Sequence, residues 1–212
     1  MKYVNFLILF VCFCVIASKG YALDGMYEER TGQRVITNVW KTEGNKVVAS
    51  NNLEIHSVLL LDDKGTILWS YQNFSEGTKL EVKREGNVLS VKGVMKNVKV
   101  DNNLHIDEAP WYQFVEASLR DFIVSEKKNT VFWIIKPADC SVFKMQAIRE
   151  KVEEITIGGR KVKAIKVKIT LTGIASLFWS VFYWYDENGV FLKYKGVKGG
   201  PGTPETIVER IM

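Results

Sequence analysis

The sequence predicts a mainly β protein in which a single curved antiparallel sheet, an open half-barrel, packs on one main α-helix. Short runs rich in Val, Ile, Leu, Trp and Tyr fill residues 34–100 and 130–211 and are separated by turn residues, a pattern typical of antiparallel strands. Between them, residues 111–123 carry apolar residues at the three- and four-residue spacing of a helix.

The composition indicates a folded chain with one domain, which we place at residues 23–212. The 212 residues are 47% hydrophobic and 25% charged and include four Pro, which excludes a low-complexity or disordered chain. Without Lys2 and Lys19, which lie in the leader, 27 basic and 24 acidic residues leave a net charge of +3. This surplus is too small to predict a nucleic-acid partner.

Residues 1–22 have the features of a secretory signal peptide. Lys2 precedes the apolar run VNFLILFVCFCVIA at residues 4–17, and Gly20-Tyr21-Ala22 places small residues where a signal peptidase cleaves. The run is shorter than the roughly 20 residues that a membrane-spanning helix needs, and no later stretch is long and apolar enough. We therefore predict cleavage after Ala22 and a periplasmic mature chain without a transmembrane anchor.

The first strand-rich region predicts an antiparallel meander over residues 34–100. Its turns are expected at Glu43-Gly44-Asn45, Asp62-Asp63-Lys64-Gly65 and Glu85-Gly86-Asn87. Leu80 and Val82 alternate with charged neighbours, so one face of the sheet is expected to be buried and the other solvated.

The helix is predicted over residues 111–123, with Asp107 as its N-cap and Pro110 in its first turn. We expect it to pack across the concave side of the sheet. Its apolar stripe consists of Trp111, Phe114, Val115, Leu119, Phe122 and Ile123.

Strands are predicted again from residue 130 to the end of the chain. Residues 130–136 form a strand ended by Pro137, while residues 141–155 fit the periodicity of either a helix or a strand, of which we favour the strand. Gly158-Gly159 makes a hairpin turn into residues 160–172. The apolar alternation changes phase there, which predicts a β-bulge near Ala164.

The run IASLFWSVFYWY at residues 174–185, followed by the turn Asp186-Glu187-Asn188-Gly189, predicts a second hairpin. If residues 177–185 are extended, Phe178, Phe182 and Trp184 lie on one face, and Trp179, Val181, Tyr183 and Tyr185 lie on the other. Both faces must then be covered. A turn around Gly199, Gly200 and Gly202 precedes a last strand at residues 205–211.

No catalytic or metal-binding motif emerges from the sequence. His56 and His105 are not spaced as metal ligands. Cys140, the one cysteine of the predicted mature chain, has no local motif that would activate its thiol. We therefore expect a non-enzymatic protein without a metal or cofactor.

Five features follow the signal peptide in order: the meander, the aromatic-rich helix, the Gly-Gly hairpin, the segment YWYDENGVFLKY at residues 183–194 and the segment GVKGGPGTPETIVERI at residues 196–211. Together they resemble an uncharacterised family of bacterial periplasmic proteins whose architecture is similar to the outer-membrane lipoprotein carriers. Those carriers use more than one helix as a lid, whereas one helix is predicted here. The resemblance implies a hydrophobic concavity suited to a lipid, an acyl chain or an extended peptide, and it assigns no functional residues.

We expect aromatic side chains of the helix and of the strand at residues 177–185 to line that concavity, although core packing explains the same residues. They are Trp111, Phe114, Trp179, Tyr183 and Tyr185. A basic group that would meet anionic lipid headgroups, or pair with Glu150, Glu153 and Glu154 across the Gly-Gly hairpin, consists of Lys161, Lys163, Lys166 and Lys168. The predicted function is binding or carrying a hydrophobic ligand in the cell envelope. The alternative is an assembly or scaffold protein that binds a protein partner through a β edge and an aromatic patch.

Overall fold

The computed structural model describes residues 23–61, 65–198 and 202–211. The predicted signal peptide, the turn residues Asp62-Asp63-Lys64 and the glycines Gly199 and Gly200 lie outside these residues. The described part forms one sheet of fourteen strands in which every neighbouring pair is antiparallel. The strands are β1 (Gly25–Thr31), β2 (Arg34–Glu43), β3 (Lys46–Ser50), β4 (Glu54–Leu61), β5 (Gly65–Asn73), β6 (Thr78–Glu85), β7 (Val88–Met95), β8 (Val98–His105), β9 (Asn129–Ile135), β10 (Val142–Ile157), β11 (Arg160–Leu171), β12 (Ser180–Tyr185), β13 (Phe191–Gly196) and β14 (Thr206–Ile211).

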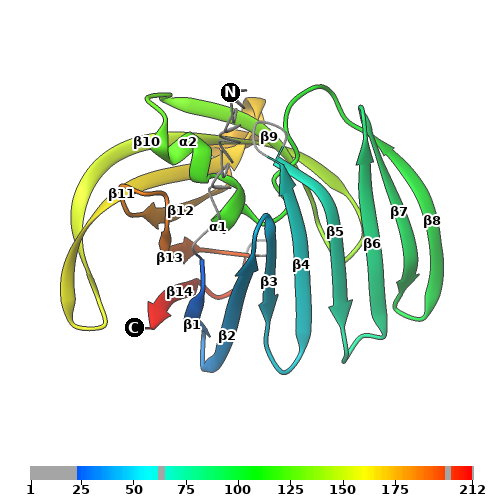
Figure 1. Ribbon diagram of the computed structural model, residues 1–212, viewed down its shortest axis with the longest axis horizontal. Coiled ribbons are helices and arrows are strands. Elements are labelled where there is room, and N and C mark those ends of the chain that lie inside the picture. Colours follow the sequence, from blue (N-terminus) through cyan, green and yellow to red (C-terminus); the bar gives the residue numbers. More distant parts are fainter. Residues whose placement is uncertain (1–22, 62–64, 199–201, 212) are drawn as a thin grey trace, which may run out of the picture.

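The sheet consists of two meanders, which are joined where the first strand of the chain pairs with the last. Strands β1 to β8 follow one another in space, as do β9 to β14, and β1 pairs with β14 in the middle of the sheet. Strands β8 and β9 are left at the two edges. The sheet curls strongly around the helical segment, and β8 lies at the far right edge in Figure 1. The predicted fold class, a mainly β protein with a curved and open antiparallel sheet, is confirmed.

The two meanders, β1–β8 and β9–β14, form the two arms of the curved sheet. The segment around Trp111 links these arms on the concave side. Trp111 forms parallel bridges to Gly65 of β5 and to Trp133 of β9. Thr66 donates its backbone N–H to the Trp111 carbonyl at 2.7 Å, and Tyr112 donates to the Trp133 carbonyl at 2.9 Å. The predicted helix start at Trp111 is therefore wrong, because the backbone groups of this segment bond to two strands instead of to a helical turn.

The helix itself is shorter than predicted and divided in two. It consists of α1 (Val115–Ser118) and α2 (Arg120–Val124). Asp107 does not cap it: its carboxylate accepts hydrogen bonds from Ala109 N and Trp133 Nε1 and pairs with Lys144. At the other end, Arg149 Nη2 lies within 3.0 Å of the carbonyl oxygens of three helix-end residues, which would otherwise lack partners. These residues are Phe122, Ile123 and Ser125.

Strands β10 and β11 form the long hairpin predicted around Gly158-Gly159, and the strand assignment of residues 141–155 is confirmed. The predicted bulge lies on β10, where the register shifts between Arg149 and Val152, and not at Ala164 of β11. The apolar alternation of β11 changes phase because both faces are covered. Ile165 belongs to the main core, whereas Ala164 packs with Trp184 and Leu192 in a smaller cluster on the other face.

Strand β12 begins at Ser180, later than the predicted extended run, because residues 173–177 form a 3₁₀ turn, η1 (Gly173–Leu177). From Ser180 onwards the predicted alternation is confirmed: Tyr183 and Tyr185 belong to the main core, and Trp184 to the smaller cluster. The helices of the described residues are all too short to cross a membrane.

Candidate functional site

An aromatic cluster covers the concave face of the sheet next to α1. The rings of Tyr27 and Trp40 stack with their centroids 3.8 Å apart, and Trp40 also lies 4.8 Å from Phe114, the residue preceding α1. Phe191 of β13 is 5.4 Å from Trp40 and 6.0 Å from Tyr183. Strands from both meanders, together with the start of the helix, therefore build one continuous apolar cluster, in which Tyr27 and Phe191 are fully buried.

Glu116 of α1 is an acidic group close enough to this cluster to act on its tyrosines. Removal of water by the surrounding protein raises its pKa above the usual value of a glutamate, while hydrogen bonding from its own backbone N–H acts in the opposite direction. Its charge in turn contributes to the raised pKa of four phenols, those of Tyr27, Tyr183, Tyr185 and Tyr194. The phenols remain protonated at neutral pH and act as hydrogen-bond donors.

The phenols differ in the partners that the structure gives them. Tyr27 Oη donates to the Phe191 carbonyl at 3.3 Å, and Tyr185 Oη donates to the Val115 carbonyl at 3.2 Å. Burial is the first cause of the raised pKa in both tyrosines, as it is in Tyr183. The cluster thus combines apolar ring faces with polar phenol tips and one carboxyl group.

The cluster is continued on β4 and β5 by a second polar and aromatic group. The His56 and Tyr71 rings lie 4.6 Å apart, and Tyr71 Oη donates a hydrogen bond of 3.0 Å to Glu54. Hydrogen bonding to His56 lowers the pKa of Glu54, and burial raises the pKa of Tyr71 to about 12. Trp69, which is fully buried beside them, has an indole Nε1 with no partner in the described part of the chain.

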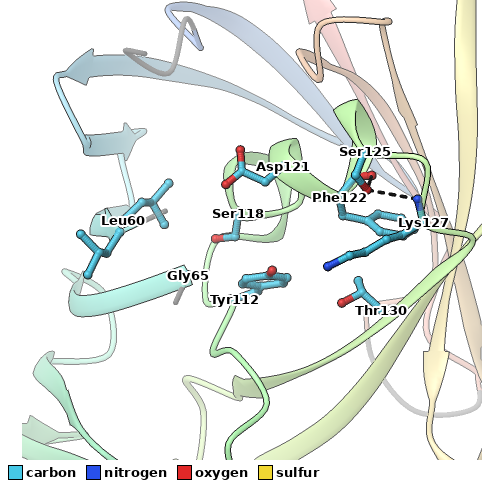
Figure 2. A pocket seen from close by; sticks show the side chains of 10 residues that line it. Leu60, Gly65, Tyr112, Ser118, Asp121, Phe122, Ser125, Lys127 and Thr130 are labelled. Carbon is cyan, nitrogen blue, oxygen red and sulfur yellow. Dashed lines mark hydrogen bonds between the residues drawn. The ribbon is translucent and has the colours of Figure 1, made fainter. Parts of the chain in front are cut away.

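A small pocket of about 150 Å³ opens between α1, α2 and the end of the β4–β5 hairpin (Figure 2). Its walls combine apolar side chains such as Leu60 and Phe122 with the polar side chains of Ser118 and Lys127. Ser118 is 8% exposed, and its hydroxyl has no hydrogen-bond partner among the described residues. The volume is below the range of about 300–1,000 Å³ that is usual for small-molecule pockets, so the pocket can hold one end of a ligand at most.

The five predicted aromatic residues fall into three places. Phe114, Tyr183 and Tyr185 meet at the concave cluster, packed against the rings described above. Trp111 is fully buried in the segment between the arms of the sheet, where its Nε1 donates to Gln113 at 2.9 Å. Trp179 follows η1, half-buried, and its Nε1 donates to the Val197 carbonyl at 3.1 Å.

The predicted basic group lies along β11 and is partly paired. Lys161 forms an ion pair with Glu154 at 2.7 Å, and Lys166 forms one with Glu150 at 3.2 Å, as expected for charges facing each other across a hairpin. Lys166 also places its amine 4.0 Å from the centre of the Phe182 ring. No ion pair with a described residue involves Lys163 or Lys168.

The thiol of Cys140 lies on the turn between β9 and β10, whereas the imidazole of His56 lies on β4. Cys140 is buried, and burial raises the pKa of its thiol, which makes it a poor nucleophile. His56 Nε2 lies 3.6 Å from Glu54 Oε1. In the part of the chain that the structure describes, no three His, Cys, Asp or Glu side chains are grouped as metal ligands.

Sequence reasoning missed Glu116, Ser118 and the group on β4 and β5. The alternation of Trp69 and Tyr71 with Ser70 and Gln72 carried a signal, because it places both rings on one face of a strand. Glu116 carried none, since its position relative to the sheet depends on where the helix begins.

Comparisons with known proteins place the fold but not the family. No protein-family profile and no curated protein matches the sequence. Among solved structures, a β-barrel-like protein of the domain of unknown function DUF1849 from Brucella abortus is similar over 88% of this chain and 94% of its own, with a TM-score of 0.58 and 10% identity. The hypothetical lipoprotein YmcC from Escherichia coli K12 is similar over 90% and 88%, with a TM-score of 0.46 and 12% identity. The chain therefore shares its β-barrel-like fold with a protein from a domain of unknown function.

Proposed function

We propose that this protein is a non-enzymatic component of the cell envelope that binds or carries a hydrophobic ligand, a lipid or an acyl chain, on the concave face of its sheet. The observation that carries the proposal is the concave aromatic cluster around Glu116. Its rings provide apolar contact, and its phenols and carboxyl group provide polar contact at the same place. The envelope location rests on the predicted signal peptide at residues 1–22.

The chemistry of the cluster suits an amphipathic molecule. Each methylene of a chain removed from water contributes about 0.8 kcal/mol, and Phe114, the partly exposed ring of the cluster, is placed to supply that contact. Two buried donors, Trp69 Nε1 on β5 and Ser118 Oγ on α1, lack partners in the described residues. Buried polar groups are nearly always hydrogen-bonded, so a ligand or water that bonds them would complete the site.

The proposal is tested by native mass spectrometry of the chain purified gently after export, followed by organic extraction. We expect a lipid at near-unit stoichiometry. Phe114→Ala removes an apolar wall of the cluster and should reduce ligand retention, and Tyr183→Phe should do so while preserving the packing. Phe74→Ala is the matched control, because this aromatic is half-exposed on the turn after β5 and lies away from the cluster.

The unfolding midpoint of each variant separates a binding effect from a folding effect. Tyr183→Phe should retain the wild-type midpoint within a few degrees, because ring volume is preserved. A wild-type mass without any bound lipid, or equal retention by all three variants, contradicts the proposal. Trp179→Ala extends the test to the residue just before β12, whose indole lies outside the aromatic cluster. If Trp179 also contacts the ligand, this variant should retain less lipid than the wild type.

A second candidate function is that of a scaffold that binds a protein partner by strand addition. It is favoured by the open edges of the sheet, since β8 pairs with β7 on one side and has no strand of the described chain on the other. An unpaired strand edge presents backbone donors and acceptors to another chain. Lys99 and Asp101 interrupt this edge with charges. Cross-linking in the periplasm followed by pull-down should then yield a stoichiometric polypeptide, whereas the carrier function predicts a lipid.

A further inference from the structure

The turn between β11 and β12 carries the most exposed large apolar side chains of the described residues. Ile174, Leu177 and Phe178 are 81%, 80% and 83% exposed, and the next most exposed, Val98, is 66% exposed. All three lie within five positions on and directly after η1. Isolated exposed apolar residues are ordinary on protein surfaces, but a group of three on one turn indicates contact with another apolar phase.

This apolar turn, which we define as Ile174, Leu177 and Phe178, is held firmly from behind. Thr170 is buried, and its Oγ1 lies 3.1 Å from the Ser176 carbonyl oxygen and 2.7 Å from that of Trp179. Trp179 Nε1 donates to the Val197 carbonyl beyond β13. The backbone of the turn is therefore tied to the sheet at both ends, while its three apolar side chains face outwards.

The turn itself contains no charged residue, and the nearest lysines lie on the strands next to it. No charged residue occurs between Lys168 and Asp186 in the sequence. Lys168 of β11 and Lys195 of β13 both stand opposite Phe182 of β12, and therefore share a face of the sheet. They lie two residues along the strands from the Thr170–Ser180 pair at the turn, a distance of about 7 Å.

The acidic groups around these lysines do not neutralise them fully. Lys195 lies 3.5 Å from Glu205, and both side chains are about half exposed. On the neighbouring hairpin, Lys144 pairs with Asp107 and Lys136 with Asp139. No ion pair joins Lys168 to a carboxylate of the described residues, so the surface behind the turn keeps a positive charge.

We propose that the apolar turn inserts into the surface of a lipid bilayer that contains anionic lipids, with Lys168 and Lys195 at the level of the headgroups. Apolar side chains of interfacial segments enter the headgroup and acyl boundary by about 5–10 Å, which matches the distance between the turn and the two lysines. Lysines at that depth are attracted to anionic headgroups.

This inference is independent of the proposed ligand site, because it uses other residues: the turn precedes β12, and Lys168 and Lys195 stand beside Phe182, on the face opposite to Tyr183. It is tested by flotation of residues 23–212 with vesicles of phosphatidylcholine alone and with vesicles of phosphatidylcholine and phosphatidylglycerol in equal parts. Variant one is I174S/L177S/F178S, and its control is V35S/V98S, which replaces exposed apolar residues elsewhere. Variant two is K168Q/K195Q.

We expect the wild type to float with the anionic vesicles and the apolar-turn variant to lose at least about tenfold in partition coefficient. The lysine variant should lose about tenfold on anionic vesicles and nothing on phosphatidylcholine, and the control should behave as wild type. Unchanged circular dichroism shows that each variant is folded. Flotation of the apolar-turn variant at the wild-type level, or no flotation of the wild type, overturns the inference. The lipid found by native mass spectrometry reports separately on the ligand site.

Discussion

The link between the two arms of the sheet can be tested by adding a single methyl group at Gly65. This residue has a φ of +74°, and a Cβ built there would lie 2.5 Å from the Trp111 carbonyl oxygen and 2.5 Å from Tyr112 Cδ1. Gly65→Ala must therefore displace the Trp111 segment. The same segment accepts the hydrogen bond from Thr66 N, which would be lost with it.

The magnitude follows from two contributions. Placing an L-residue in the left-handed region costs roughly 1–2 kcal/mol, and loss of the backbone hydrogen bond and displacement of the Trp111 segment add about 1–2 kcal/mol more. Gly65→Ala should thus lower the free energy of unfolding by about 2–4 kcal/mol. Gly44→Ala is the matched control, because Gly44 has a φ of +60° and its Cβ would have no neighbour within 4 Å. This control should lose only the roughly 1–2 kcal/mol of the backbone contribution.

The measurement is urea denaturation followed by circular dichroism, with both variants and the wild type under one set of conditions. The quantity of interest is the difference between the two variants, which isolates the close approach of the Trp111 segment to β5. Equal losses in Gly65→Ala and Gly44→Ala would refute the bridge and, with it, the reason given for the late start of the helix.

Three further predictions concern titratable groups. Glu116 binds its proton more tightly in the folded state, so its contribution to stability is present at low pH and is lost as pH rises through its raised pKa. Glu116→Gln should remove this loss, which is worth about 1.4 kcal/mol per unit of pKa shift. The check is the urea midpoint of both proteins from pH 4 to 9, and a variant with the wild-type pH profile would contradict the prediction. Asp107 has a pKa of about 2, lowered chiefly by its hydrogen bond with Lys144. Asp107→Asn should therefore lower the free energy of unfolding by about 1 kcal/mol above pH 4, a value reduced because the carboxylate is 40% exposed. The difference between variant and wild type should disappear as pH falls through about 2, and a difference that persists there would point to packing instead. Cys140 should react with a thiol reagent more than about tenfold faster in denaturant than in the native protein, because burial raises the pKa of its thiol; equal rates would show that the β9–β10 turn opens readily.

Local sequence patterns predicted the hairpins, whereas the start of the helix and strand β1 depend on tertiary contacts and were not predicted. The turns at Gly44, Gly86 and Gly158-Gly159 were found because positive φ angles at glycines are a local requirement. Strand β1 was not assigned, since its run GMYEERT buries Tyr27 as its one fully covered side chain. The helix start failed for a different reason: the Trp111 segment has helical periodicity, but its hydrogen bonds go to strands distant in sequence.

The same distinction applies to the candidate site. Tyr183 and Tyr185 were placed on one face by alternation along a strand, and the structure has both in the core cluster against which Phe114 packs. Trp179 was grouped with them by the same alternation, but it precedes β12, and Trp111 was grouped with them as part of the predicted helix, but it bridges two strands instead. Glu116 became visible only when α1 was located between the two arms, because a single glutamate in an apolar stretch has no sequence pattern that reveals its surroundings.

The pairing of β1 with β14 has a consequence for the order in which the chain assembles. Met26 stands opposite Ile211, so this pair closes a loop of roughly 180 residues, and by loop-closure entropy that step costs about 2.5 kcal/mol more than closing a ten-residue hairpin. Each meander contains only hairpins between successive strands and is able to zip locally, whereas the junction between them must wait until the last strand has been synthesised. Until then, β1 and β13 each present a bare edge, and these are the surfaces at which an unfinished chain is most exposed to pairing with a neighbour.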